Sequence, residues 1–223
     1  MTINNIVYII APHPDDETLA CGGTIKKLIR NGHIVKWIIV CKGEKSHQIT
    51  FPHESEPTID FLIQQRKTEC IDAAKTLGVL TENITFLNYE DLSAEEKFTE
   101  IKSKIYSIIK KDICWVTKLY FPHPRDKHTD HKAVGKLMFN LAAEHKWDAT
   151  IMMYKIYKRN YTKLPPEWYV IEDIGNDLDT KIKAIQNYES QTSLWMPYQD
   201  KTIIPKKLLN FFITSEMEIF YKI

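Results

Sequence analysis

Short apolar runs alternate with longer, helix-like segments along the first two-thirds of the chain. The runs are rich in β-branched residues and have the length of buried strands, whereas the segments between them have helical length and helical stop signals. Predicted strands cover 6–10, 34–40, 84–88 and 118–122, and predicted helices cover 18–31, 58–77, 94–111 and 129–145. Strands that alternate with helices form parallel sheets whose two faces are covered by helices. The sequence therefore predicts an α/β protein with a mostly parallel sheet.

The remaining third continues the same domain. Two further strands are predicted at 149–154 and 168–171, followed by a helix at 177–189 and a tail rich in proline and aromatic residues. Gly32 and Gly78 stand just past predicted helices, where C-terminal caps favour glycine, and Ser93-x-x-Glu96 is typical of a capping box. No linker or repeat interrupts the pattern. We expect one domain over residues 1–223 with a three-layer, Rossmann-like fold.

The turn after the first strand carries three ionisable groups in a row. Ala11-Pro12-His13-Pro14-Asp15-Asp16-Glu17 follows the apolar run Ile6–Ile10 directly, and the two prolines end the strand. Adjacent carboxylates and an imidazole are costly to hold together unless a positive charge lies among them. Histidine nitrogen and aspartate oxygen are good zinc ligands. Taken alone, such a turn is more often an Asx-type turn or a helix cap, in which the acids face the helix dipole, than a set of metal ligands.

A second cluster supplies further ligands. Residues 121–131 read Phe-Pro-His-Pro-Arg-Asp-Lys-His-Thr-Asp-His, again at the end of a predicted strand and before a helix. His13, Asp16 and one imidazole from His128 or His131 make three protein ligands, which is the pattern of a catalytic zinc site with an open position. The chain has no Cys-x-x-Cys pair, as a structural site would favour. Both clusters fall at the carboxyl ends of predicted parallel strands, where α/β proteins place their sites.

Together the two motifs resemble the PIG-L/LmbE-like family of zinc-dependent de-N-acetylases. The resemblance rests on His13-Pro14-Asp15-Asp16-Glu17 with His128-x-Asp130-His131, and secondary matches extend over most of the chain. These are Cys21-Gly22-Gly23-Thr24, Arg66-x-x-Glu69 with the following Ala73–Gly78, Lys183-Ala184, Tyr188-x-Ser190-Gln191 and Glu218-x-Phe220. Such a resemblance implies removal of acetyl groups from glycosides that contain N-acetylglucosamine.

The resemblance also implies residue roles. His13, Asp16 and His131 match the metal ligands, and Asp15 matches the carboxylate proposed as general base. His128 matches the imidazole proposed to stabilise the oxyanion or to protonate the leaving amine. A divalent ion, expected to be one zinc per chain, acidifies water, a positioned base adds about 10²–10⁴ in rate, and a charged His128 suits the oxyanion. Asp130 or Asp126 is expected to keep His128 charged, and we favour Asp130.

Two regions are positioned to select the substrate. The segment 42–57 is too long for a mere connector, and Trp195-Met196-Pro197-Tyr198 offers an aromatic face to a sugar. Arg66 is a candidate for fixing the hydroxyl groups of a sugar, although an exposed arginine paired with Glu69 one helical turn away is an equally ordinary interpretation. We therefore expect Arg66 and Trp195 to bind substrate.

Composition narrows the partners and the compartment. The net charge is +1 with both signs mixed, so no nucleic-acid footprint or polybasic membrane patch is present. The four scattered cysteines fit a reduced, cytoplasmic setting. The amino terminus leads directly into a strand, and no apolar stretch approaches the roughly 18–20 residues of a membrane span. We expect a small sugar substrate, no nucleic-acid or membrane partner, and leave open whether copies of the chain associate.

Two rival functions remain compatible with the sequence. One is a zinc amidase that cleaves an acylated amine other than a sugar, because such an enzyme shares every catalytic residue. The other is a non-catalytic nucleotide-binding α/β protein. Against the second, no Gly-x-Gly-x-x-Gly follows any predicted strand, and Cys21-Gly22-Gly23 lies inside a helix, where it permits close packing or substrate approach.

Overall fold

One seven-stranded sheet runs through the molecule. The computed structural model describes residues 5–157 and 166–222, and its strand order is β3-β2-β1-β4-β5-β7-β6. The first five strands in this order are parallel, and β7 is antiparallel to both of its neighbours. The strands are β1 (Ile6–Ala11), β2 (Ile34–Cys41), β3 (Ile84–Tyr89), β4 (Val116–Pro122), β5 (Thr150–Tyr154), β6 (Tyr169–Asp173) and β7 (Met217–Lys222). The predicted mostly parallel α/β sheet is confirmed.

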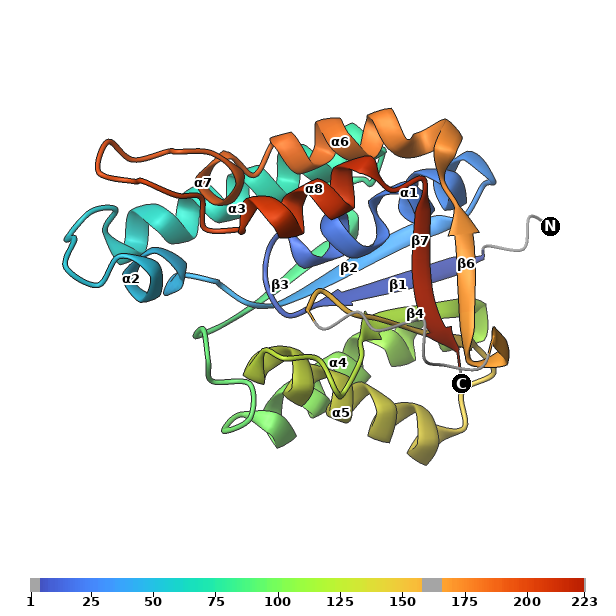
Figure 1. The fold of residues 1–223 in the computed structure, drawn as a ribbon. Coiled ribbons are helices and arrows are strands. Elements are labelled where there is room, and N and C mark those ends of the chain that lie inside the picture. The colour runs from blue at the N-terminus through green and yellow to red at the C-terminus, as the bar shows by residue number, and fades with distance from the viewer. Residues whose placement is uncertain (1–4, 158–165, 223) are drawn as a thin grey trace.

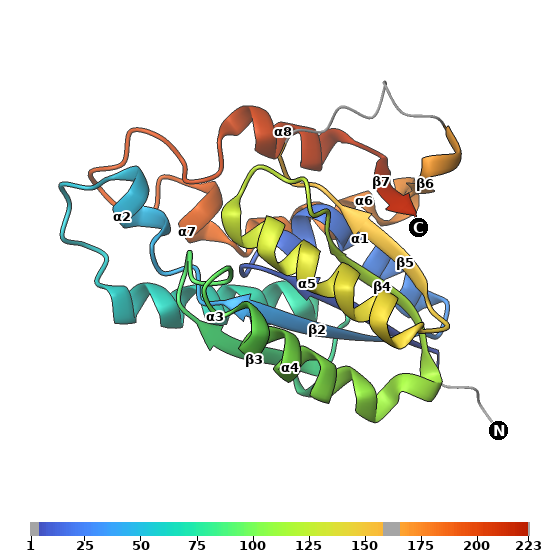
Figure 2. The ribbon, with the colours of Figure 1, turned by 90° about the horizontal axis from the view of Figure 1, so that it is seen from below.

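Helices cover both faces of this sheet, as Figures 1 and 2 show. One face carries α1 (Asp16–Arg30), α3 (Ile59–Leu77), α6 (Leu178–Gln186) and α8 (Lys206–Thr214). The opposite face carries α4 (Phe98–Ile109) and α5 (Thr129–His145). The short helices α2 (Ser46–Thr50) and α7 (Glu189–Thr192) lie together at the end of the molecule toward which β1 and β2 point. Short 3-10 turns occupy Thr81–Asn83, Lys110–Trp115, Pro166–Trp168 and Gly175–Asp177.

The first strand shows why the sheet needs helices on both sides. All six residues of β1 are at most 5% exposed, and successive side chains of a strand point to opposite faces. Val7 and Ile9 belong to the hydrophobic cluster under α1 and α3, whereas Tyr8 and Ile10 belong to the cluster under α4 and α5. A continuous apolar run of this kind is what burial on both faces of a parallel sheet requires.

The boundary of α4 differs from its prediction for a specific reason. The helix begins at Phe98 rather than near residue 94, and the proposed capping box at Ser93 does not form. Instead, the backbone N–H groups of Leu92 and Ala94 donate to the two carboxylate oxygens of Asp130, at 2.8 and 3.1 Å. A distant carboxylate therefore holds this segment in a loop.

The carboxy-terminal part also departs from the predicted pattern. Residues 206–214 form α8, although the sequence suggested only an irregular tail, and the predicted helix 177–189 divides into α6 and α7. Glu218 lies in the closing strand β7, which inserts between β5 and β6. Only the family resemblance of Glu218-x-Phe220 pointed to this strand, and it gave no sign of the strand's place in the sheet.

Two glycines of α1 bring this carboxy-terminal part close. A Cβ on Gly23 would lie 2.5 Å from the Ile174 side chain, and one on Gly22 would lie 2.9 Å from Lys181. The Gly23 N–H donates to Glu218 at 2.9 Å, and the same carboxylate is 2.8 Å from the Lys181 ammonium group. The paired glycines therefore serve close packing, one of the two roles predicted for them.

Candidate metal centre and active site

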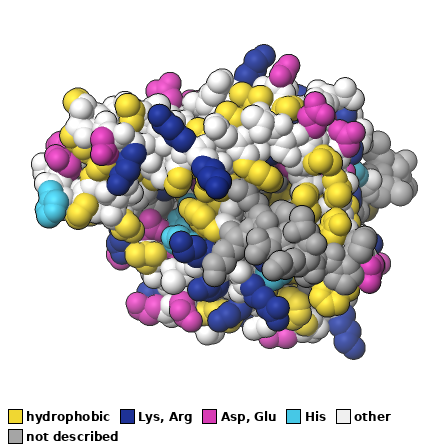
Figure 3. Space-filling view, viewed as in Figure 1, with side chains coloured by type: hydrophobic (Ala, Val, Ile, Leu, Met, Phe, Trp, Pro, Cys, Tyr) yellow, Lys and Arg dark blue, Asp and Glu magenta, His cyan; other side chains and the backbone are white. Residues whose placement is uncertain are grey.

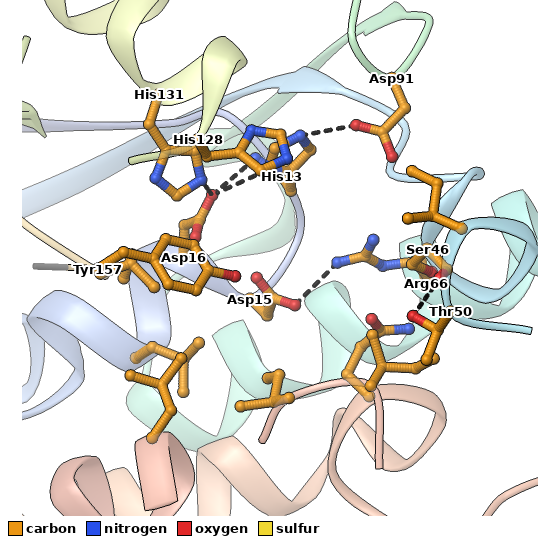
Figure 4. A pocket seen from close by; sticks show the side chains of 17 residues that line it. His13, Asp15, Asp16, Ser46, Thr50, Arg66, Asp91, His128, His131 and Tyr157 are labelled. Atoms are coloured by element: carbon orange, nitrogen blue, oxygen red, sulfur yellow. Dashed lines mark hydrogen bonds and ion pairs between the residues drawn. The ribbon is translucent and has the colours of Figure 1, made fainter. Parts of the chain in front are cut away.

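The two sequence motifs meet at the carboxyl ends of β1 and β4. These two strands are neighbours in the sheet. The strand order reverses at β1, which has β2 on one side and β4 on the other, and α/β folds bind ligands at such a reversal. A cavity of about 230 Å³ opens there. Histidine and acidic side chains are visible in a recess of the surface in Figure 3, and Figure 4 shows the cavity from close by. The ionisable residues that line it are His13, Asp15, Asp16, Arg66, Asp91, His128, His131 and Tyr157.

The turn after β1 places its carboxylates by an unusual backbone conformation. Asp15 has φ 125°, a region that residues other than glycine rarely adopt and that costs of order 1–3 kcal/mol. Its N–H donates to Glu17 at 3.2 Å, and its carboxylate accepts from the Arg66 guanidinium at 2.8 Å. Arg66 also donates to the carbonyl oxygen of Pro14 at 2.5 Å. The surroundings therefore hold this strained turn from both sides.

Three predicted ligands converge around one carboxylate oxygen. Oδ2 of Asp16 lies 3.3 Å from Nδ1 of His13 and 3.1 Å from Nε2 of His131. All three side chains are under 9% exposed. In Figure 4 the His13, His128 and His131 rings lie together over Asp16. The fold therefore brings one oxygen and two imidazole nitrogens, drawn from α1, α5 and the turn after β1, to a single point.

The protonation of this cluster fits a cation site. Burial disfavours charge on His131, but Asp16 and Asp126 together outweigh burial and raise the pKa of His131 to about 9. Burial likewise opposes charge on Asp16, yet the two imidazoles hold its pKa well below the usual range. The protonated imidazoles therefore neutralise the Asp16 carboxylate in the way that a bound divalent ion would. Nδ1 of the buried His131 has no hydrogen-bond partner among the described residues and lies 3.7 Å from Asp126 Oδ2, an arrangement suited to orienting Nε2 toward an ion.

Two further carboxylates hold His13. Its Nε2 lies 2.8 Å from Asp91 and 3.1 Å from Asp130. Sequence reasoning missed Asp91, which follows β3 at the same edge of the sheet as the other clusters. The signal that could have identified Asp91 was its position just after the end of a predicted parallel strand. The backbone N–H of Asp91 donates to the buried Glu44, which comes from the long segment after β2.

Asp130 lies where the sequence did not place it. Its carboxylate contacts His13, Leu92 and Ala94, whereas its oxygen is 3.9 Å from His128 Nδ1. Asp126 does not take over the expected task, since its carboxylate faces His131 and accepts from backbone N–H groups. The Asp130 carboxylate therefore lies against His13, and the Asp126 carboxylate lies near His131.

The surroundings of His128 disfavour the charged imidazole that the sequence analysis expected. Burial, followed by the charges of His13 and His131, lowers the pKa of His128 to about 4. A bound cation has the same sign and acts in the same direction. Nδ1 accepts the Asp130 N–H at 3.3 Å, which leaves the single ring hydrogen on Nε2. One nitrogen from each of His13, His128 and His131 lies within 4.8 Å of the others, so these three imidazoles together form a candidate metal-binding group.

The surroundings of Asp15 bring the pKa of its carboxyl close to neutral pH. Burial raises the pKa of this carboxyl to about 8, while Arg66 pulls it down and Asp16 and Glu17 push it up. A catalytic base works best when its pKa is close to the pH of the reaction, because a useful fraction is then deprotonated and still binds a proton well. In Figure 4 Asp15 stands between the histidine cluster and Arg66, at the floor of the cavity.

The two predicted substrate residues have different surroundings from those expected. Arg66 is 3% exposed, and its guanidinium is bonded to Asp15, Pro14 and Gly43. The alternative of an exposed pair with Glu69 is wrong, because Glu69 is buried and accepts from Ser190. Trp195 stacks on Phe61 at 5.8 Å and is not among the described residues that line the cavity. The structure therefore gives Trp195 a packing contact beside α3.

A buried network beneath the turn was not anticipated in detail. Glu17 is fully buried and accepts from the hydroxyl groups of Tyr188 and Thr18 as well as from the Asp15 N–H. The sequence showed both partners, since Glu17 belongs to the first motif and Tyr188 to the Tyr-x-Ser-Gln element. Their contact across 171 positions had no local signal.

The PIG-L model for GlcNAc-PI de-N-acetylases matches residues 8–142, which include the whole of both motifs. The chain belongs to the PIG-L family. The diacetylchitobiose deacetylase of Thermococcus kodakarensis is 27% identical over 208 residues, covering 86% of this chain and 74% of the relative. A probable N-acetyl-alpha-D-glucosaminyl L-malate deacetylase 2 of Bacillus cereus is 26% identical and covers 83% of each chain.

Solved structures agree on the fold. The N,N'-diacetylchitobiose deacetylase of Pyrococcus horikoshii matches with a TM-score of 0.74 and 23% identity, covering 98% of this chain and 84% of the other. The A40926 pseudoaglycone deacetylase Dbv21 matches with a TM-score of 0.71 and 18% identity, covering 99% and 97%. Membership in this PIG-L family makes the chain an N-deacetylase hydrolase, and its histidine and aspartate cluster provides a site able to hold a metal ion. Within the described ranges no helix is both long and apolar enough to span a bilayer.

Proposed function

We propose that this PIG-L protein removes the N-acetyl group of a small N-acetylglucosamine-type sugar in a zinc-dependent hydrolysis. The carrying observation is the convergence of His13, Asp16 and His131 beside Asp15 in one cavity. Zinc suits two imidazole nitrogens and one carboxylate oxygen. The sugar class is supported by the named relatives, which act on diacetylchitobiose or N-acetylglucosaminyl malate.

The metal and the base have separate tasks. His13, Asp16 and His131 would hold the ion, and when bound it supplies Lewis-acid polarisation of the amide carbonyl and makes water more acidic. Asp15 takes the proton of the attacking water and then holds the proton that the leaving amine requires. Arg66 fixes the Asp15 carboxylate at 2.8 Å. The tight pairing of Arg66 assigns it to positioning Asp15 rather than to binding hydroxyl groups.

The neutral His128 serves the oxyanion. Its Nε2 carries the hydrogen because Nδ1 accepts the Asp130 N–H. A neutral imidazole donor stabilises the negative oxygen that develops as water adds to the amide carbonyl. Asp130 then has an indirect role. Its carboxylate contacts His13, and its backbone N–H donates to the His128 ring.

The polar side of the cavity suits sugar hydroxyl groups. Asp91, Ser46, Thr50 and Gln191 line it, and unpaired buried polar groups favour a ligand that satisfies them. Ser46 and Thr50 lie in α2, within the long segment expected to contact substrate. The four free cysteines further support a cytoplasmic enzyme, and the continuous sheet supports a single domain over the whole chain.

An amine-release assay on the zinc-loaded protein tests this function. The panel pairs N-acetylglucosamine and diacetylchitobiose with acetylated amino acids and acetylated peptides. We expect free amine and acetate from the sugars at a rate that chelation abolishes and zinc restores. Cleavage of the acylated amino acids without cleavage of the sugars would replace this proposal with a zinc amidase that acts on other amines.

A further inference from the structure

The cavity has two chemically different walls. The imidazoles, carboxylates and Arg66 form one, whereas aliphatic side chains form the other. Figure 4 shows side chains made of carbon alone on the opposite side of Asp15 from the three imidazoles. Apart from the exposed Ile49, the aliphatic lining residues are Leu19, Ile156, Ile203, Ile204 and Leu208, here called the aliphatic wall. Tyr157 also lines the cavity and lies beside Asp16 in Figure 4. A site built only for a polyhydroxylated sugar would not need such a surface.

The aliphatic wall is largely continuous with the hydrophobic core, because Leu19, Ile156 and Ile204 belong to one core cluster and Leu208 packs against it. Ile203 is half-buried and belongs to neither hydrophobic cluster of the described residues. Its neighbour Ile204 is fixed by an N–H donated to the Gln191 carbonyl oxygen at 2.9 Å. Leu208, also half-buried, lies in the first turn of α8, where its N–H donates to Pro205 at 2.8 Å. Anchored backbone thus presents apolar side chains to the ligand space.

The geometry of an amide assigns this surface to one part of the substrate. A trans amide is planar and directs its two carbon substituents to opposite sides of the C–N bond. The reacting carbonyl carbon must lie at Asp15 and the ligand cluster. With the sugar on the polar wall, the acyl group extends toward the aliphatic wall.

We propose that the aliphatic wall binds the acyl group of the substrate and accepts N-acyl amino sugars with chains longer than acetyl, such as propanoyl. This inference rests on the proposed function. Hydrolysis remains balanced: the amide C–N bond breaks, a C–O bond forms from water, and the water proton reaches the amine through Asp15. The products are a short-chain carboxylate and the free amino sugar.

The two walls also differ in their relation to the family. All the proposed ligands and catalytic groups lie within residues 8–142, which the family model covers. Four of the five wall residues lie beyond that range, with Leu19 the exception. The aliphatic wall therefore comes mainly from the part of the chain that the family model does not cover.

A matched substrate series tests the proposal. The zinc-loaded protein is given N-acetyl-, N-propanoyl- and N-butanoylglucosamine, and kcat/KM is measured by amine release. We expect propanoyl to exceed acetyl by about fourfold, the effect of removing one further methylene from water. Leu208→Asn should reduce this ratio to one or below. The control is Leu209→Asn, because Leu209 is the neighbouring half-buried leucine and is not among the described residues that line the cavity.

Ile203→Asn provides a second test that does not disturb α8. It should reduce the propanoyl-to-acetyl ratio as Leu208→Asn does, and the ratio is independent of how much protein is folded. An acetyl preference in the unaltered protein, or a fourfold ratio that both wall variants retain, would overturn the proposal. No hydrolysis of any sugar in the series would instead overturn the proposed function, and the inference with it.

Discussion

The polar and aliphatic walls of the cavity come from different parts of the chain and are built in different ways. The polar wall is formed mainly by the turns after β1 and β3 and by the starts of α1 and α5, so that the shared edge of the parallel strands brings His13, Asp91 and His131 together. The aliphatic wall comes mainly from Ile156 and the segment before and within α8, which reach the site through long-range packing. The parallel sheet thus positions the ionisable residues of the site. The segments that pack onto the sheet determine the shape of the cavity.

We expect the largest effect from substitutions of the proposed metal ligands in the polar wall. His13→Ala, Asp16→Ala and His131→Ala should each abolish stoichiometric zinc and lower kcat/KM by at least about 10³-fold, since the ion supplies several kcal/mol of transition-state stabilisation. Elemental analysis of purified protein measures the metal. The matched control is His123→Ala, a half-buried imidazole of the same β4–α5 loop that packs on Tyr221 at 4.5 Å. Full occupancy in all three ligand variants would remove the metal centre from the account.

Substitution of His128 tests whether this residue is an oxyanion donor or a metal ligand. His128→Ala should keep the zinc and lose about 10²–10³ in kcat, because an oxyanion donor acts mainly in the transition state. His128→Gln retains a donor and should recover part of that loss. The measurement pairs steady-state kinetics with metal content. Loss of zinc from His128→Ala would make His128 a ligand, which its position within 4.8 Å of His13 and His131 makes a direct alternative.

Arg66 separates positioning from substrate binding. Its guanidinium is fully engaged with Asp15, Pro14 and Gly43, so Arg66→Ala should lower kcat by about 10- to 100-fold through misplacement of Asp15 and leave KM nearly unchanged. The exposed neighbour Lys67→Ala serves as the control. A raised KM with an unchanged kcat would restore the first interpretation, in which Arg66 binds the sugar.

The smallest effect concerns the contact between the two parts of the chain. Gly23→Ala introduces a Cβ 2.5 Å from Ile174, and the overpacking of roughly 1–3 kcal/mol exceeds the gain in helix propensity. We expect a net loss of about 1–2 kcal/mol, or roughly 2–8 °C in Tm. Gly175→Ala, whose added Cβ meets nothing closer than 3.4 Å, is the control. Equal thermal stability of Gly23→Ala and the unaltered protein would contradict the close packing.

Local sequence was sufficient for elements whose cause is local. The apolar run of β1, the prolines around His13 and the glycine after α3 each determine structure within a few residues, and these predictions are confirmed. The ligand candidates could be grouped because the ends of parallel strands share one edge of a sheet. Asp91 escaped notice because it stands outside any motif, although that same rule applies to the end of β3.

Side-chain pairing was beyond the reach of sequence. Asp130 looked like the partner of His128 because the two are neighbours in the chain, yet its carboxylate lies against His13 and the loop before α4. Arg66 looked exposed because its helix has charged neighbours, yet it is buried against Asp15. In both cases a tertiary contact more than 35 positions away determines the direction of the side chain.

The role of Asp15 is the central claim, and the isosteric variant Asp15→Asn tests it most directly. The substitution preserves shape but removes the proton acceptor. Zinc content and kcat are measured on the same preparation with an N-acetylated sugar. We predict one zinc per chain, as in the unaltered protein, and a kcat lower by about 10²–10⁴ with little change in KM. Near-normal turnover with zinc in place would contradict the account.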